Sequence, residues 1–203
     1  MAIGVSFVIP VLNEEGAVAD LLRDLRQCYP HSQLIVVDGG SRDRTVPLAL
    51  PLCDQLLLSD SGRASQMNLG GQVASMPYVF FLHADSCPGV SGSALEAYLD
   101  ARPVWGFCRV RLGSERLPFR MIEWFMNQRS RMTSVATGDQ MMFVKKTVFD
   151  ESGGFDDIPL MEDVAYCKRL RRLQAPIIIQ APVLTSSRRW EEGGVVLTVL
   201  RMW

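Results

Sequence analysis

The sequence holds few of the residues from which disulfide frameworks and zinc sites are built. Its 203 residues include five cysteines and two histidines. The cysteines are odd in number, and no two of them form a C-x-x-C pair: Cys28, Cys53, Cys87, Cys108 and Cys167. Disulfide-rich secreted proteins and zinc modules both need regular cysteine spacings. The pattern therefore favours reduced thiols, which are typical of a cytoplasmic protein.

Long apolar runs and an excess of one charge are missing as well. No run approaches the roughly 20 apolar residues that a membrane-spanning helix needs. Residues 1–5 contain neither a basic segment nor a cleavage site, so we expect no signal peptide. Lys and Arg total 21 against 22 Asp and Glu, a formal net charge of −1. Because bulk positive charge drives non-specific nucleic-acid binding, we expect no nucleic-acid partner.

Two common nucleotide-binding motifs are also missing. The first expected strand is followed by PVLNEE at residues 10–15, an acidic segment without glycine until Gly16. A nicotinamide-dependent dehydrogenase would carry G-x-G-x-x-G at this point, and a P-loop protein would carry G-x-x-x-x-G-K-[ST]. Neither motif occurs in the chain, which argues against both classes.

Apolar residues are abundant, at 48%, and they are sufficient to bury a core. Runs of β-branched and aromatic residues predict strands at 5–11, 33–37, 55–58 and 78–82. Helical spacing predicts three intervening helices. The first is capped by Asn13 and has Glu14 in its first turn, and the second is capped by Asp43. The third covers 63–74. Strands that alternate with helices form right-handed βαβ units, so we expect a mostly parallel sheet flanked by helices.

The second half is less regular. It predicts strands at 105–112, 141–144 and 177–179, and helices at 118–131 and 162–173, the former with Phe125 on its apolar side beside Ile122 and Met126. No repeat, low-complexity tract or linker interrupts the chain. We therefore expect an α/β fold in one domain, 1–203, with a nucleotide-like half at 1–100 and a smaller mixed region at 101–203.

Three expected strands end in polar residues. The first is followed by Asn13 and Glu14, the second by Asp38 and two glycines, and the fourth by His83-Ala84-Asp85. Any one of these is an ordinary turn sequence. In an open parallel sheet, however, ligands bind beyond the carboxyl ends of the strands. Three polar strand ends at one edge therefore predict a binding site.

These segments resemble the nucleotide-sugar half of family 2 glycosyltransferases of the GT-A fold. The resemblance rests on six motifs in the family's order: FVIPVLNEE at 7–15, VVDGGSRDRT at 36–45, GRASQMN at 62–68, LHAD at 82–85, GDQ at 138–140 and MED at 161–163. It implies a GT-A-like, Rossmann-type sheet with an acceptor-side half at 101–203. Within the family, the chain is most similar to a short bacterial subgroup associated with arsenosugar or selenium-related gene clusters.

The resemblance implies a divalent cation, Mn²⁺ or Mg²⁺, bound by Asp85. Such a cation bridges phosphate oxygens and needs only one or two protein carboxylates. Asp85 corresponds to the last aspartate of the family's D-x-D motif, but His83 replaces the first. Neutral imidazole suits Mn²⁺ better than Mg²⁺. Three roles for His83 stay open: it ligates the metal, it forms a hydrogen bond with a ribose or phosphate, or it only fills space in the protein interior.

The resemblance places the remaining donor contacts around the strand ends. Asp38 would accept a hydrogen bond from the base or ribose, and Gly39 would allow the backbone to approach the ligand. Arg63 would face the diphosphate. The other residues of the donor side are Pro10, Asn13, Glu14, Asn68 and Ala84. Each also has an ordinary structural interpretation: Glu14 as an acid in a first helical turn, Arg63 as a solvated surface charge.

The acceptor side is implied by motifs in the second half. The resemblance makes Asp163 the base that takes the proton of an acceptor hydroxyl, which implies one displacement with inversion of the anomeric centre. Glu162, Asp139 and Gln140 would contact the substrate. Glu162 and Asp163 equally suit a helix N-terminus, where acids interact favourably with the helix dipole.

The end of the chain partly resembles the Q-x-x-R-W motif of processive family 2 synthases. Ser186 replaces the glutamine, so we interpret Arg189 and Trp190 as acceptor or phosphate contacts and expect no processivity. The apolar run at 195–200 suggests a homodimer contact or a peripheral membrane contact.

Two alternatives remain at this stage. A sugar-1-phosphate nucleotidyltransferase would share the fold type and the metal aspartate, but it needs a glycine-rich basic loop after the first strand. A non-catalytic nucleotide-sugar-binding protein would keep the fold without turnover, and His83 in place of an aspartate favours it.

Overall fold

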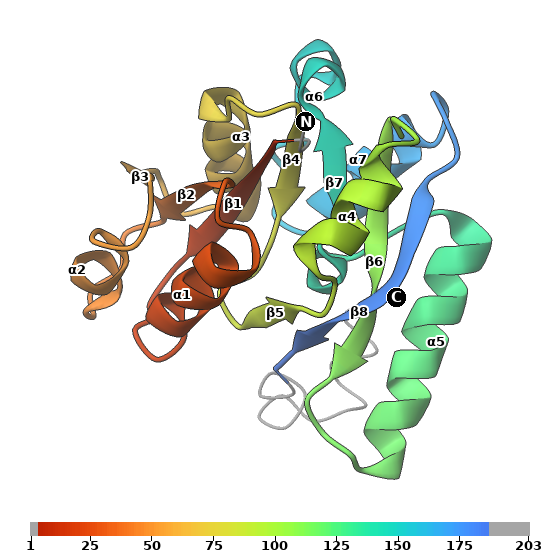
Figure 1. Cartoon of the computed structure of the whole chain (residues 1–203), viewed down its shortest axis with the longest axis horizontal. Helices are drawn as coiled ribbons and strands as arrows, with labels where there is room; N and C mark the ends of the chain where they lie inside the picture. The colour runs from red at the N-terminus through yellow and green to blue at the C-terminus, as the bar shows by residue number, and fades with distance from the viewer. Residues whose placement is uncertain (1–3, 187–203) are drawn as a thin grey trace.

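Four parallel strands form the first half of the sheet, in a computed structural model that describes residues 4–186 (Figure 1). They are β1 (Val5–Val11), β2 (Gln33–Asp38), β3 (Gln55–Leu58) and β4 (Tyr78–Phe81), in the order β3-β2-β1-β4. β1, β2 and β4 are almost entirely buried, as expected for strands covered on both faces. The predicted parallel sheet is confirmed.

The second half of the sheet is mixed. Four strands continue the order beyond β4: β7 (Phe143–Lys145), β6 (Trp105–Leu112), β8 (Ile177–Thr185) and β5 (Ser86–Pro88). β7 is antiparallel to both β4 and β6, whereas β8 runs parallel to β6. Both halves of the chain therefore contribute to one sheet, and its mixed part includes β5 from the first hundred residues as well as β6, β7 and β8.

Helices cover both faces of this sheet (Figure 1). One face carries α1 (Val18–Cys28) and α4 (Gly92–Leu99), whose leucines pack on alternate residues of β1. The other face carries α3 (Arg63–Val73), α6 (Lys146–Ser152) and α7 (Glu162–Leu170). α5 (Leu117–Thr133) packs on β6, and α2 (Thr45–Ala49) follows β2. None of the helices in the described residues is long and apolar enough to cross a membrane.

The first helix begins later than the sequence predicts. α1 starts at Val18, and Asn13 is not its cap: Asn13 has a left-handed φ of 55°, and its Oδ1 accepts a hydrogen bond from the Arg42 backbone at 2.8 Å. The backbone of Glu14 donates to Thr45 Oγ1 at 2.7 Å. The loop after β1 is thus tied to the loop after β2, and this long-range pairing replaces the expected helical turn.

Four further expectations differ from the structure. Asp43 does not cap α2; it lies one residue before the cap and accepts from the Thr45 backbone at 2.9 Å. The last strand extends to Thr185 because β5 pairs with its end. Phe125 is 57% exposed and lies away from the core. Among the described residues, β5, α4 and α6 were not expected at all, since each is short and weakly periodic.

Close packing between α3 and α6 gives a test of the fold. A Cβ placed on Gly71 would collide with the ring of Phe149, with Cε1 2.5 Å away, and Phe149 is buried. Overpacking of this kind costs roughly 1–3 kcal/mol. We expect Gly71→Val to lower the free energy of unfolding by that amount in urea denaturation. Gly16→Val is the control, since nothing lies within 4 Å of its Cβ position. Equal midpoints for the two variants would contradict the packing.

Candidate active site

A cavity of about 310 Å³ opens beyond the carboxyl ends of β1 and β4. We call it the strand-end cavity. Six of the residues predicted from the sequence line it: Pro10, Glu14, Arg63, His83, Ala84 and Asp85. They come from three separate segments, because parallel strands end at one edge of the sheet and α3 begins beside it. The arrangement gathers two carboxylates, a guanidinium and an imidazole around one opening.

Arg63 and His83 contact each other at the wall of this cavity. Arg63 Nη2 lies 3.3 Å from His83 Nδ1, and Asp139 Oδ1 lies 3.6 Å from the same nitrogen. A guanidinium has only donors, so a hydrogen bond from Arg63 requires Nδ1 to be the acceptor, with the ring proton on Nε2. Pairing with the Asp139 carboxylate instead requires a proton on Nδ1, and in the neutral ring this leaves the lone pair on Nε2. Asp139, a predicted substrate residue, lies behind the histidine.

Glu162 is the first residue of the acidic pair Glu162-Asp163 that begins α7, and it contacts Arg63 at the cavity wall. Its side chain is 7% exposed, and its Oε1 lies 3.5 Å from Arg63 Nε. Burial raises the pKa of the Glu162 carboxyl, and the charge of Asp163 adds to the rise, while Arg63 opposes it. Arg63 therefore lies between Glu162 and His83, so its guanidinium is held in place at the cavity wall.

Asp163 binds the backbone of Gly138, which in turn lies against Arg63 and His83. Its Oδ2 accepts a hydrogen bond from the Gly138 N–H at 2.7 Å, and its Oδ1 accepts from the Val164 N–H at 2.7 Å. A carboxylate has about four acceptor positions, so both oxygens keep capacity for a further donor. Asp163 does not line the strand-end cavity itself.

Gly138 lies directly against Arg63 and His83. A Cβ at this position would collide with the guanidinium and come within 2.5 Å of His83 Nε2. Gly138 begins the short 3₁₀ turn Gly138–Gln140, whose backbone binds Asp163. The absence of a side chain at residue 138 therefore lets the arginine, the histidine and the turn occupy one small volume.

Asp85 is the residue that fits a cation best. It is half-buried, and among the described residues its carboxylate forms no hydrogen bond or ion pair. It also borders a second cavity of about 320 Å³, which reaches Thr185 and Ser186. Hard divalent cations need only one or two carboxylates when phosphate and water supply the other oxygens. In the part of the chain that the structure describes, no cluster of three metal-ligating side chains occurs, so the fit depends on Asp85.

Asp38 lies at the end of β2, paired with Val11 of β1, and is 2% exposed. Its Oδ2 accepts hydrogen bonds from the backbones of Gly40 and Ser41, both at 2.9 Å. Its Oδ1 is buried without a hydrogen-bond partner in residues 4–186. An unsatisfied buried acceptor costs about 1–3 kcal/mol. Oδ1 is therefore an acceptor without a donor in the described residues, but it is buried and Asp38 does not line the strand-end cavity.

Two predicted site residues have their polar groups bound elsewhere. The amide of Asn68 accepts from and donates to the backbone of Phe155, at 2.7 and 2.8 Å. Gln140 is fully buried, and its Oε1 accepts from Ser130 Oγ at 2.8 Å. Neither they nor Asn13 and Gly39 line the strand-end cavity. The positions of Arg189 and Trp190, and of the apolar run at 195–200, lie outside the described residues.

Several residues of the site were not predicted from the sequence. The strand-end cavity is also lined by Val11, Leu12, Ser61, Gly62 and Gln66. Gln66 Nε2 donates to the carbonyls of Val11 and Val37, at 2.9 and 2.8 Å, and so joins α3 to the ends of β1 and β2. A glutamine in the first turn of a helix that follows a strand is the signal that could have indicated it.

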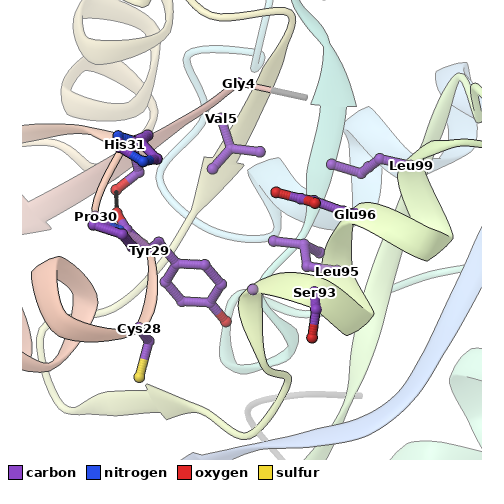
Figure 2. Close-up of a pocket in the computed structure, with 12 residues that line it drawn as sticks. Gly4, Val5, Cys28, Tyr29, Pro30, His31, Ser93, Leu95, Glu96 and Leu99 are labelled. Atoms are coloured by element: carbon purple, nitrogen blue, oxygen red, sulfur yellow. Dashed lines mark hydrogen bonds between the residues drawn. The ribbon is translucent and has the colours of Figure 1, made fainter. Parts of the chain in front are cut away.

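A separate cavity of about 290 Å³ lies at the opposite end of β1. Figure 2 shows Tyr29, Pro30 and His31, from the turn before β2, facing Leu95 and Leu99 of α4 across it. Its lining contains none of the predicted site residues. The predicted site residues that line the strand-end cavity therefore lie at the carboxyl ends of the strands, away from this one.

Comparison with known proteins gives a family and a set of similar folds. The family model "Glycosyl transferase family 2" matches residues 6–154, more than half of the chain. Among curated protein sequences, none matches the chain. Solved structures with a similar fold are numerous, and they include proteins crystallised with UDP-GlcNAc or GDP-Man.

One such structure is the S. aureus TarS fragment 1–349 in complex with UDP-GlcNAc. The identity is 15%, the TM-score is 0.71, and the match covers 90% of this chain and 58% of TarS 1–349. Another is the mannosyltransferase PcManGT from Pyrobaculum calidifontis in complex with GDP-Man and Mn²⁺. Here the identity is 19%, the TM-score is 0.65, and the match covers 90% of this chain and 56% of the PcManGT chain. The chain spans less than two thirds of either, and at these identities the likeness shows the GT-A fold alone.

Proposed function

This chain belongs to glycosyl transferase family 2, and on that premise we propose that it transfers a sugar from a nucleoside diphosphate sugar to an acceptor hydroxyl. The transfer proceeds with inversion, needs Mn²⁺ or Mg²⁺, and adds one sugar at a time. The observation that carries the proposal is the strand-end cavity, where Glu14, Arg63, His83 and Asp85 meet. The narrower resemblance to the short bacterial subgroup stays a prediction, as does cytoplasmic location.

The donor would bind with its diphosphate between Arg63 and Asp85. Arg63 is held by Glu162 and His83, so its guanidinium needs little reordering to meet a phosphate. Asp38 Oδ1 has no donor within residues 4–186, and it would accept from the base or ribose if donor binding opens the end of β2. When bound at Asp85, Mn²⁺ or Mg²⁺ would stabilise the negative charge of the departing nucleoside diphosphate. The nucleotides in the TarS and PcManGT structures are consistent with such a donor.

The acceptor hydroxyl would approach Asp163. The Gly138 and Val164 backbones fix the two oxygens of this carboxylate, and a fixed carboxylate within hydrogen-bond reach can accept a proton from a hydroxyl. Asp163 would remove that proton as the oxygen attacks the anomeric carbon on the face opposite the diphosphate. One displacement of this kind inverts the anomeric configuration.

Product analysis separates the proposal from its alternatives. The protein is incubated with UDP- and GDP-linked sugars and a panel of hydroxyl acceptors, with and without Mn²⁺. A glycosyltransferase releases free nucleoside diphosphate and glycosylated acceptor. Formation or consumption of pyrophosphate would instead indicate a nucleotidyltransferase. Tight binding of a nucleotide sugar without any product would indicate a binding protein, and either result contradicts the proposal.

The role of Asp85 gives a second test. We expect Asp85→Ala to lower the affinity for UDP or GDP at least about tenfold when Mn²⁺ is present. The affinity without metal should stay nearly unchanged, because loss of a carboxylate ligand removes only the part of the binding free energy that depends on the cation. Isothermal titration calorimetry measures both. Asp100→Ala, which removes an exposed carboxylate at the end of α4, serves as the control. Equal Mn²⁺ dependence in Asp85→Ala and the wild type would exclude Asp85 as the ligand.

A further inference from the structure

α5 presents a second apolar face that is largely exposed in the described residues 4–186. Its inner face packs on β6 through Phe119 and Met126. Its outer face carries five large apolar side chains that are between 54% and 84% exposed: Leu117, Met121, Trp124, Phe125 and Met132. Their spacing by four, three, one and seven residues places them in one stripe along the helix. We call these five residues the α5 stripe.

The position of α5 leaves this stripe open to solvent. In Figure 1 the helix lies at the outer edge of the molecule, with β6 and β8 on its inner side. Trp124 and Phe125 contact each other edge to face, with ring centroids 4.9 Å apart, and both remain more than half exposed. Contiguous apolar surface of this kind marks an interaction site in soluble proteins.

Arginines lie beside the stripe. A groove of about 430 Å³ between α5, β6 and β8 is lined by Arg109, Arg131 and Trp124, among others. Both arginines are exposed, and neither forms an ion pair in the described part of the chain. Among the described residues, the lining of the groove contains no carboxylate, and the two acids between Arg109 and Arg131 in the sequence are paired with other arginines, Glu115 with Arg111 at 3.3 Å and Glu123 with Arg120 at 2.7 Å. The groove therefore has unbalanced positive charge next to apolar side chains.

We propose that the α5 stripe and the Arg109–Arg131 groove bind the surface of an anionic lipid bilayer. Amphipathic helices with Trp, Phe and Leu on one face and basic residues alongside lie in the plane of the interface, with the apolar face in the acyl boundary. Arginine pairs with the phosphate oxygens of headgroups. The unpaired charges of Arg109 and Arg131 give this surface a preference for anionic over neutral lipid.

A second copy of the chain fits this surface less well. In a symmetric dimer the same patch faces itself. Such an interface would bring Arg109 and Arg131 close to the equivalent arginines of the second copy, and the two acids between them in the sequence, Glu115 and Glu123, are already paired with other arginines. Like charges brought together without counter-charges are unfavourable. An anionic bilayer supplies the missing negative charge.

Sedimentation with sucrose-loaded vesicles tests the proposal on the full chain. We expect binding to mixed phosphatidylcholine–phosphatidylglycerol vesicles and much weaker binding to phosphatidylcholine alone. Arg109→Gln combined with Arg131→Gln should weaken binding roughly 20- to 30-fold, since each basic residue near an anionic surface contributes about fivefold. Trp124→Ser combined with Phe125→Ser should weaken it at least about tenfold.

Matched controls distinguish the surface from general effects. Arg102→Gln with Arg172→Gln removes the same charge elsewhere, and Leu58→Ser with Leu173→Ser removes exposed apolar residues elsewhere; both should bind like the wild type. Equal binding to neutral vesicles would overturn the proposal. So would release by millimolar inorganic phosphate with no effect of the Trp124/Phe125 change, which would indicate a free-phosphate site. A dimer dissolved by that change, with no vesicle binding, would indicate a second copy instead.

Discussion

Asp163→Asn is expected to lower turnover by about 10² to 10⁴ while donor binding is retained, because proton removal by a positioned base contributes a factor of that size. Asparagine keeps the shape of the side chain, and its amide oxygen can still accept from the Gly138 N–H, as Asp163 does at 2.7 Å. The amide nitrogen of asparagine replaces the oxygen that accepts from the Val164 N–H, so one of the two backbone hydrogen bonds is kept and one is lost. The contact with the turn at Gly138 is preserved, and the side chain can no longer accept a proton. Release of nucleoside diphosphate measures turnover, and calorimetry with the donor measures binding.

The matched control for this change is Asp157→Asn, an exposed acid five residues before the start of α7. It should leave both quantities unchanged. An Asp163→Asn protein that turns over within a few fold of the wild type would remove Asp163 from the role of base. A comparable loss of donor affinity would instead assign Asp163 to donor binding.

Strands that are buried on both faces leave a strong pattern, and the sequence predicts the limits of β1, β2 and β4 to within one residue. The limits of β1, β3 and β6 coincide with the predicted 5–11, 55–58 and 105–112. Elements defined by distant partners are less visible. β5 has three residues and exists as a strand through its pairing with β8, about a hundred residues away in sequence. Similarly, the loop at Asn13 is set by hydrogen bonds to residues 41–45.

For the candidate site, the sequence likewise predicts which residues lie at the strand ends but not which partners their side chains bind. The strand-end rule brings Glu14, His83 and Asp85 to one cavity, and the resemblance adds Arg63. The rule does not say what a polar side chain binds. Asn68 is as polar as its neighbours, yet its amide is bound to the backbone of Phe155, 87 residues away. Gln140 is bound within the buried turn near Ser130. Partners of this kind are known only once the chain is folded.

Gly138→Ala tests a contact of the candidate site that the GDQ motif at 138–140 does not reveal. A methyl group at residue 138 would collide with the Arg63 guanidinium and with His83 Nε2. His83 is 8% exposed and has little room, whereas the Arg63 side chain is 32% exposed and can turn away. We therefore expect the fold to persist and Arg63 to leave the cavity wall. Loss of one charge-stabilising donor lowers turnover by about 10² or more, and we expect that loss.

A double-mutant cycle decides whether Gly138→Ala acts through Arg63. If displacement of the guanidinium is the cause, Arg63→Ala alone should lower turnover to a similar extent, and adding Gly138→Ala to Arg63→Ala should lower it little further. Gly113→Ala is the control for glycine substitution near the cavities, because its Cβ position meets Thr185 O at an ordinary 3.5 Å. Two independent, multiplicative losses would mean that Gly138 acts through the Asp163 hydrogen bond rather than through Arg63. Near-normal turnover of Gly138→Ala would mean that the close packing of Gly138, Arg63 and His83 is unimportant for catalysis.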